Sequence, residues 1–117
     1  MPGEPQDDCL FCKIVAGQIP ATVVRETETT VAFRDINPQA PTHILVIPKA
    51  HYENAAALAV GAPQLAADVL AETQAVADEE ELESYRIVFN TGSGAGQTVW
   101  HAHAHLLGGR GMEWPPG

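Results

Sequence analysis

The stretch that decides the fold lies near the C-terminus and reads Gly92-Ser93-Gly94-Ala95-Gly96-Gln97-Thr98-Val99-Trp100-His101-Ala102-His103-Ala104-His105-Leu106-Leu107. Three histidines alternate with small apolar residues directly behind a glycine-rich loop. Side chains of a β-strand point to opposite faces in turn, so this spacing predicts a strand with all three imidazoles on one face. A row of imidazoles beside a loop of accessible backbone N–H groups suits chemistry on a phosphate.

Such a row is compatible with three interpretations. Imidazole has an ordinary pKa of about 6.5, so a neutral histidine could attack phosphorus at pH 7 and form a covalent nucleotidyl-imidazole. A His-x-His pair on a strand could instead hold a catalytic zinc ion, with the third histidine completing the site. The third interpretation is that the histidines are partly buried and only satisfy hydrogen bonds. The strict alternation of three histidines argues against this last interpretation.

Composition and charge limit the class of protein. The chain has 117 residues, of which 45% are hydrophobic and 18% charged, and we expect a flexible tail over 1–8 followed by one domain over 9–117. A net charge of −9 argues against binding to nucleic acid. No apolar run approaches the ~20 residues of a membrane span, so no membrane partner is expected. The start lacks the basic and apolar regions of a signal peptide, which predicts a cytoplasmic protein.

Outward from the histidine row, the pattern predicts an α+β domain with a five-stranded, mostly antiparallel sheet and one long and one short helix. The long helix is expected from Pro63 to about Leu82, and shorter helical stretches over 9–16 and 52–58. Strands are expected over 22–26, 30–34, 43–48, 86–90 and 99–107. The run at 43–48 is almost entirely apolar, which is typical of a central strand covered on both faces.

Two cysteines form a Cys-x-x-Cys pair at Cys9 and Cys12. The pair could be a redox couple, half of a metal site or two inert thiols, because a Cys-x-x-Cys pair alone is a weak signal. The redox interpretation needs a thioredoxin-like context that this pattern lacks. A zinc site needs two more ligands, for which His51 and His101 are the candidates.

The histidine row resembles the signature of the histidine triad (HIT) superfamily, His-φ-His-φ-His-φ-φ, in which φ is apolar. Most of the remaining chain is similar to the Hint branch, the histidine triad nucleotide-binding proteins. The matching segments are Phe33-Arg34-Asp35-Ile36-Asn37-Pro38-Gln39-Ala40-Pro41-Thr42-His43, Ile44-Leu45-Val46-Ile47-Pro48-Lys49-Ala50-His51, Arg86-Ile87-Val88-Phe89-Asn90, Gly108-Gly109-Arg110 and Trp114-Pro115-Pro116-Gly117. The departures are small: alanines fill the internal φ positions, Trp100 stands where tyrosine is common, and Thr98 stands where serine is common.

This resemblance implies a HIT-like fold, a homodimer that joins two five-stranded sheets, and hydrolysis of purine nucleoside 5′-phosphoramidates. It implies that His103 is the nucleophile, that His105 binds the phosphate and helps to protonate the leaving amine, and that His43 supports them. Asp35 would hold the ribose hydroxyls. The nucleotide-binding residues implied in this way are Phe33, Asp35, Ile36, Asn90, Gly96, Gln97, Thr98, His105 and Trp114.

The same resemblance implies a structural zinc ion held by Cys9, Cys12, His51 and His101. In that case His101 is not free to act as a catalytic donor. Two alternatives to a phosphoramidase remain open: a dinucleoside polyphosphate hydrolase of the same superfamily, and a non-enzymatic nucleotide-binding regulatory protein. A nucleotidylyltransferase is disfavoured, because those relatives usually carry glutamine at the position of His105.

Overall fold

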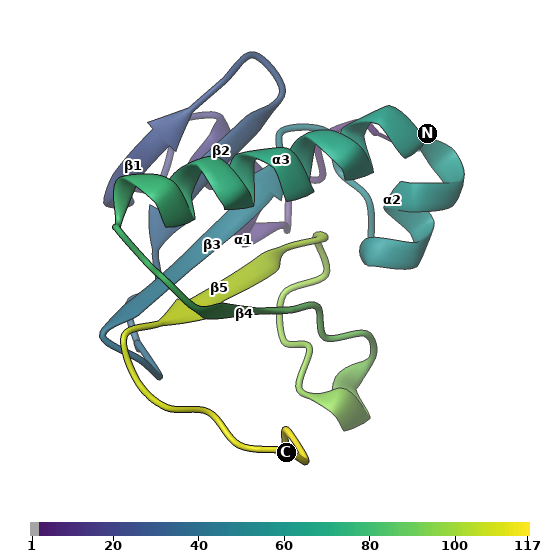
Figure 1. Cartoon of the computed structure of the whole chain (residues 1–117). Helices are drawn as coiled ribbons and strands as arrows, with labels where there is room; N and C mark the ends of the chain where they lie inside the picture. Colours follow the sequence, from purple (N-terminus) through teal and green to yellow (C-terminus); the bar gives the residue numbers. More distant parts are fainter. Residues whose placement is uncertain (1–2) are drawn as a thin grey trace.

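The computed structural model describes residues 3–117, so the first two residues of the predicted tail lie outside the described residues. The chain forms one five-stranded sheet with the strand order β1-β2-β3-β5-β4, in which all neighbouring strands are antiparallel (Figure 1). The strands are β1 (Val23–Glu26), β2 (Thr30–Arg34), β3 (Thr42–Pro48), β4 (Tyr85–Val88) and β5 (Ala104–Gly108). The helices are α1 (Leu10–Val15), α2 (Ala55–Gly61), α3 (Pro63–Glu79) and the short 3₁₀ turn η1 (Ser93–Ala95). The predicted α+β class and five-stranded sheet are confirmed.

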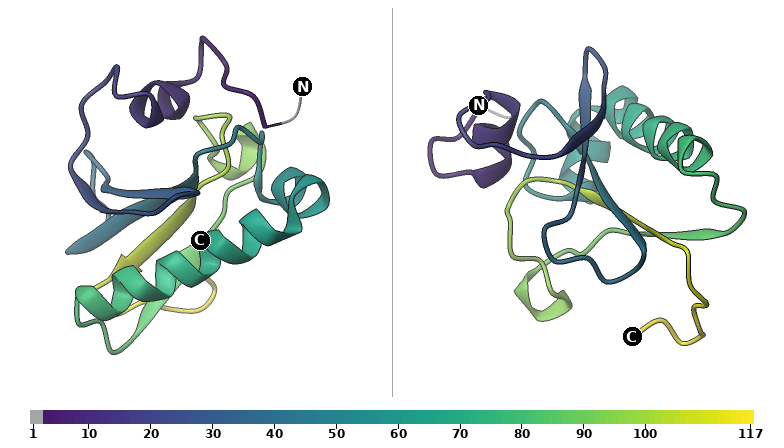
Figure 2. Two further views of the ribbon diagram at one scale, coloured as in Figure 1. Left: turned by 90° about the horizontal axis from the view of Figure 1, so that it is seen from above. Right: turned by 90° about the vertical axis from the view of Figure 1, so that its left-hand side faces the viewer.

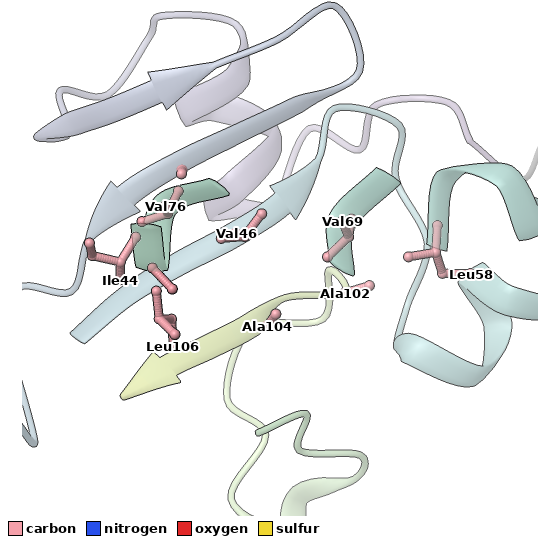
Figure 3. Close-up of a cluster of buried hydrophobic side chains, with 10 residues drawn as sticks. Ile44, Val46, Leu58, Val69, Val76, Ala102, Ala104 and Leu106 are labelled. Carbon is pink, nitrogen blue, oxygen red and sulfur yellow. The ribbon is translucent and has the colours of Figure 1, made fainter. Parts of the chain in front are cut away.

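The long helix α3 covers one face of the sheet, and α1 lies on the opposite face (Figure 2). Pro63 begins α3, where its fixed φ suits the first helical turn and its missing N–H costs nothing. The core between α3 and the sheet is made of small and branched apolar side chains from α2, α3, β3 and β5, including Leu58, Val69, Ile44 and Leu106 (Figure 3). None of the described helices is long and apolar enough to cross a membrane.

A smaller apolar cluster lies under α1 on the other face. Phe11 of α1 packs there against Phe33 of β2 and Ile47 of β3, with ring centroids of the two phenylalanines 5.4 Å apart. The chain leading to α1 is also tied down, because Gly3 exchanges backbone hydrogen bonds of 2.9 and 3.2 Å with His51 just after β3. As a result, the N-terminal segment and the end of β3 lie side by side.

The histidine row enters the sheet later than expected. Instead of a strand over 99–107, β5 begins only at Ala104, because the preceding backbone pairs elsewhere: the Ala102 N–H donates to the Tyr52 carbonyl at 2.7 Å. The alternation nevertheless continues through this segment. Ala102, Ala104 and Leu106 are buried in the core under α3, so the intervening histidines face α1.

The short helix after β3 is displaced from its predicted position over 52–58. It begins at Ala55, because the Asn54 side chain caps its N-terminus by accepting a hydrogen bond from the Ala57 N–H at 2.9 Å. The shift leaves Tyr52 outside the helix, where its carbonyl accepts from the histidine segment.

Candidate active site and metal centre

A cavity of about 320 Å³ opens on the α1 face of the sheet, between α1, β2 and the segment before β5. Its walls are mainly apolar, and its polar side chains are those of Arg34, Asp35, Thr98, His103 and His105. Six of the residues implied by the resemblance line this cavity: Phe33, Asp35, Ile36, Thr98, His103 and His105. A mostly apolar cavity with a few convergent polar groups is the usual form of a small-molecule site.

Four other residues that were expected to bind nucleotide do not line this cavity. Gln97 is only 2% exposed, and its amide is engaged within the chain, with Nε2 donating to the Glu53 carbonyl at 2.8 Å. Asn90 lines a separate hollow beside β4, and Gly96 sits in the loop with a positive φ of 93°. Trp114 is 83% exposed on the C-terminal segment. In this structure, Gln97 holds the glycine loop instead, because its Oε1 accepts a hydrogen bond from the Gly92 N–H at 2.9 Å.

The geometry around His103 determines which of its nitrogens is free. Nδ1 lies 2.7 Å from the backbone carbonyl of His101, and a carbonyl can only accept, so Nδ1 carries the proton and Nε2 bears the lone pair. The ring of Phe11 packs edge-on against this imidazole at a centroid distance of 5.0 Å. Burial lowers the pKa of His103, so the imidazole is neutral at pH 7 and its Nε2 is a competent nucleophile.

His105 lines the cavity and forms a hydrogen-bonded pair with His43, a buried residue of β3. His43 Nε2 lies 2.9 Å from His105 Nδ1, and the Asp35 carboxylate lies 3.4 Å from the same His43 nitrogen. Burial, reinforced by the neighbouring histidines, lowers the pKa of His105 to about 4. Its Nε2 is buried and has no hydrogen-bond partner among the described residues. Buried polar atoms are almost always paired, so this nitrogen is available to bind a molecule in the cavity.

The second cluster brings together Cys9 and Cys12 at the start of α1, His51 after β3 and His101 before β5. One ligand atom from each of these side chains lies within 4.8 Å of the other three. The Sγ atoms of the two cysteines lie 3.4 and 3.5 Å from His101 Nδ1, and Cys12 Sγ lies 3.3 Å from His51 Nδ1. His101 Nε2 donates to the Pro48 carbonyl at 2.8 Å, which turns Nδ1 towards the sulfurs.

This donor set suits a tetrahedral zinc ion. Zinc–sulfur and zinc–nitrogen bonds of about 2.3 and 2.0 Å place neighbouring S and N ligands about 3.5 Å apart, close to the three distances observed. Burial raises the pKa of Cys9 to about 11, a cost to the thiolate that a bound cation would remove. Asp35, His43 and His105 also lie close together, but His43 Nε2 and His105 Nδ1 are already paired with each other.

One wall of the cavity was not found from the sequence. Leu10, Phe11 and Ile14 of α1 line the cavity opposite β2, together with Ile19 in the following loop. The sequence did contain an indication of this wall, because Phe11 lies between the two cysteines that were expected to share a metal with His101. A ligand set that joins 9–12 to 101 places α1 beside the histidine row.

The fold and the two histidine clusters define a class of small α+β domains built around a histidine-bearing strand and an adjoining glycine loop. The chain belongs to the HIT domain family, whose model matches residues 16–112. It is 53% identical to a HIT family hydrolase of Legionella pneumophila, with a TM-score of 0.89 over 94% of this chain and 100% of that one.

Two sequence relatives span most of the chain. An uncharacterised HIT-like protein of Synechococcus elongatus is 48% identical over 95% of this chain and 98% of its own length. A protein of Zea mays, named 14 kDa zinc-binding protein, is 49% identical over 92% of this chain and 87% of its own length. The expected membership of the HIT superfamily is confirmed.

Proposed function

We propose that this protein hydrolyses the P–N bond of purine nucleoside 5′-phosphoramidates through a covalent nucleotidyl-His103 intermediate. The observation that carries the proposal is the hydrogen bond from His103 Nδ1 to the His101 carbonyl, which leaves the Nε2 lone pair free at the cavity. The Nε2 atom of His105 has no hydrogen-bond partner among residues 3–117, and the His105 ring lies next to that of His103, with ring centroids 4.9 Å apart. Similarity to a protein described as a HIT family hydrolase supports hydrolysis as the reaction class.

The reaction takes place in two halves. Nε2 of His103 attacks phosphorus and forms an N–P bond, while the P–N bond to the amine breaks and the amine, which accepts a hydrogen bond from Nε2 of His105, takes its proton from solvent. Water then attacks the same phosphorus, the bond to His103 breaks, and the proton from water passes to solvent, while Nε2 of His105 donates a hydrogen bond to the phosphate. Dividing one displacement into two in this way is the advantage of nucleophilic catalysis.

The cavity offers complementary groups for each part of a nucleotide. Phe33, Ile36 and Phe11 supply apolar walls for the base, and the Asp35 carboxylate supplies two acceptors for the ribose hydroxyls. Thr98 supplies a hydroxyl for the phosphate near His103. A role for Asn90, Gly96, Gln97 and Trp114 in nucleotide binding stays a prediction.

The second cluster is proposed to hold one structural zinc ion through Cys9, Cys12, His51 and His101. The donor distances support this assignment, as does similarity to a maize protein named as zinc-binding. These residues would join α1, the end of β3 and the histidine segment. Zinc would therefore hold both Phe11 and the carbonyl of His101 at the cavity, while taking no part in the chemistry itself.

The protein is also proposed to form a homodimer. A hollow of about 750 Å³ lies on the α1 face at the edge strand β4, lined by Arg86, Val88, Leu107 and the C-terminal segment. A second copy pairing at this edge would cover the hollow and extend the sheet. Sedimentation equilibrium should therefore give twice the chain mass of 12.5 kDa, and a monomer at micromolar concentration would contradict the proposal.

Steady-state kinetics on two substrates will distinguish the candidate reactions. We expect kcat/KM for an adenosine 5′-phosphoramidate to exceed that for a dinucleoside polyphosphate by at least about tenfold, because the site provides a donor for an amine leaving group. The reverse preference would favour the dinucleoside polyphosphate hydrolase. Tight binding of AMP with no turnover of either substrate would favour a non-enzymatic nucleotide-binding protein.

A further inference from the structure

The turn between β2 and β3 brings a backbone donor to the histidine pair. The N–H of Gln39 donates to Nδ1 of His43 at 3.0 Å. His43 is only 6% exposed, so water has little access to replace this bond. The donor belongs to the backbone, and so the Gln39 side chain is not part of the contact.

This bond determines the position of every proton in the neutral pair. An N–H group can only donate, so Nδ1 of His43 is the acceptor and the proton of His43 is on Nε2. That proton faces His105 Nδ1 at 2.9 Å, and a second proton at this distance would repel it. Nδ1 of His105 is therefore bare and its proton is on Nε2, the atom without a partner among the described residues.

We propose that the backbone N–H of Gln39 is a positioning group that locks His43, and through it His105, in the Nε2–H tautomer. In this tautomer, the buried Nε2 of His105 carries a proton and can donate a hydrogen bond to a bound substrate. The catalytic meaning of that donor rests on the proposed function. The tautomers themselves are a property of the free protein.

A second contact holds this turn in place. Arg110, just after β5, donates from Nε to the backbone carbonyl of Gln39 at 2.9 Å. The adjacent Gly109 has a φ of +88°, and a Cβ atom at this position would lie 2.9 Å from Cβ of Pro41. Only glycine allows the turn after β5 to approach so closely. Arg110 is therefore proposed as a second positioning residue, which acts through Gln39 without touching substrate.

Nitrogen-15 NMR of the histidine rings tests the lock directly in the ligand-free protein. At about pH 8, well above the ordinary histidine pKa of about 6.5, both His43 and His105 should show a protonated Nε2 and a bare Nδ1. A proton on Nδ1 of either ring would overturn the inference, whatever the activity. Absence of phosphoramidate turnover in the same sample would instead count against the proposed function, so the two failures are distinguishable.

Two substitutions at one position separate the backbone donor from the side chain. Gln39→Pro removes the N–H, whereas Gln39→Ala keeps it. One hydrogen bond is worth about fivefold in an equilibrium, so the proline variant should show a mixture of tautomers and a fall in kcat of about fivefold or more. The alanine variant should keep the wild-type tautomers and kcat. An unchanged tautomer in a folded Gln39→Pro variant would overturn the proposal.

Substitutions of Arg110 test the same series of contacts, which runs from Arg110 through Gln39 and His43 to His105. They also avoid placing proline in the turn. Arg110→Met should shift the tautomer ratio in the same direction as Gln39→Pro but less strongly, and Arg110→Lys should restore it in part. Arg86→Met is the matched control, because Arg86 is also an arginine that donates to a backbone carbonyl, that of Glu113 at 3.0 Å. An equal tautomer shift in the Arg86 and Arg110 variants would contradict the positioning role.

Discussion

Replacing His103 by alanine is expected to abolish phosphoramidate turnover, with a fall in kcat on the order of 10⁴-fold or more. The loss should be this large because alanine offers no nucleophile, and the donor of His105 would then have only the uncatalysed attack of water to assist. Steady-state assays will measure the loss. Mass spectrometry of quenched wild-type enzyme should find one nucleoside monophosphate on the peptide that carries His103, and the variant should carry none.

Nucleotide binding provides the control for this variant. The apolar walls and the Asp35 carboxylate do not depend on His103, so the Kd for AMP should change by less than about tenfold. Circular dichroism and zinc content should match those of the wild type. Full activity in a folded His103→Ala variant would contradict the nucleophile assignment, and a covalent adduct on His105 would transfer that role to the neighbouring imidazole.

Removal of the zinc ligands is expected to have the largest effect on stability. Cys9→Ala with Cys12→Ala should reduce zinc from about one ion per chain to none. It should also lower the free energy of unfolding by about 3 kcal/mol or more, because the ion joins segments far apart in the sequence. For a domain of this size, the melting temperature should fall by about 10 °C or more. Metal analysis and thermal unfolding measure the two effects.

A serine pair at the same positions separates coordination from packing. Cys9→Ser with Cys12→Ser nearly preserves the side-chain volume but replaces thiolates by poor zinc ligands, so it should lose zinc as the alanine pair does. Zinc retained in either double variant would contradict the four-ligand site. If chelation abolished activity while the melting temperature stayed constant, that result would favour a catalytic zinc ion at the histidine row.

The local pattern of the chain was sufficient to predict the sheet and its central strand. Alternation of histidine with alanine placed the alanines in the core and the imidazoles on the other face, even though β5 begins only at Ala104. The predicted start of this strand was wrong, because strand pairing depends on which backbone groups lie opposite one another in the folded chain. The Ala102 N–H meets the carbonyl of Tyr52, a residue 50 positions earlier, and leaves the ladder of β3.

The candidate site was predictable to the extent that its residues carry distinctive chemistry. Cysteine and histidine are few in this chain, so His51 and His101 were the candidates to join the cysteine pair. The resemblance to HIT proteins implied a zinc site of these four residues, and the structure brings their side chains together. The wall formed by α1 was missed because Phe11 is an ordinary apolar residue. Its position at the cavity depends on how a short helix docks, which local periodicity does not encode.

By itself, the sequence determined the period of the histidine row, the types of donor available and the order of the elements, because these depend on neighbours along the chain. Only the tertiary structure decided what each histidine faces. His101 meets two thiols, His103 meets a carbonyl, and His105 meets His43. The physical reason is that an imidazole takes its tautomer from its hydrogen-bond partners, and these partners are brought together only by folding.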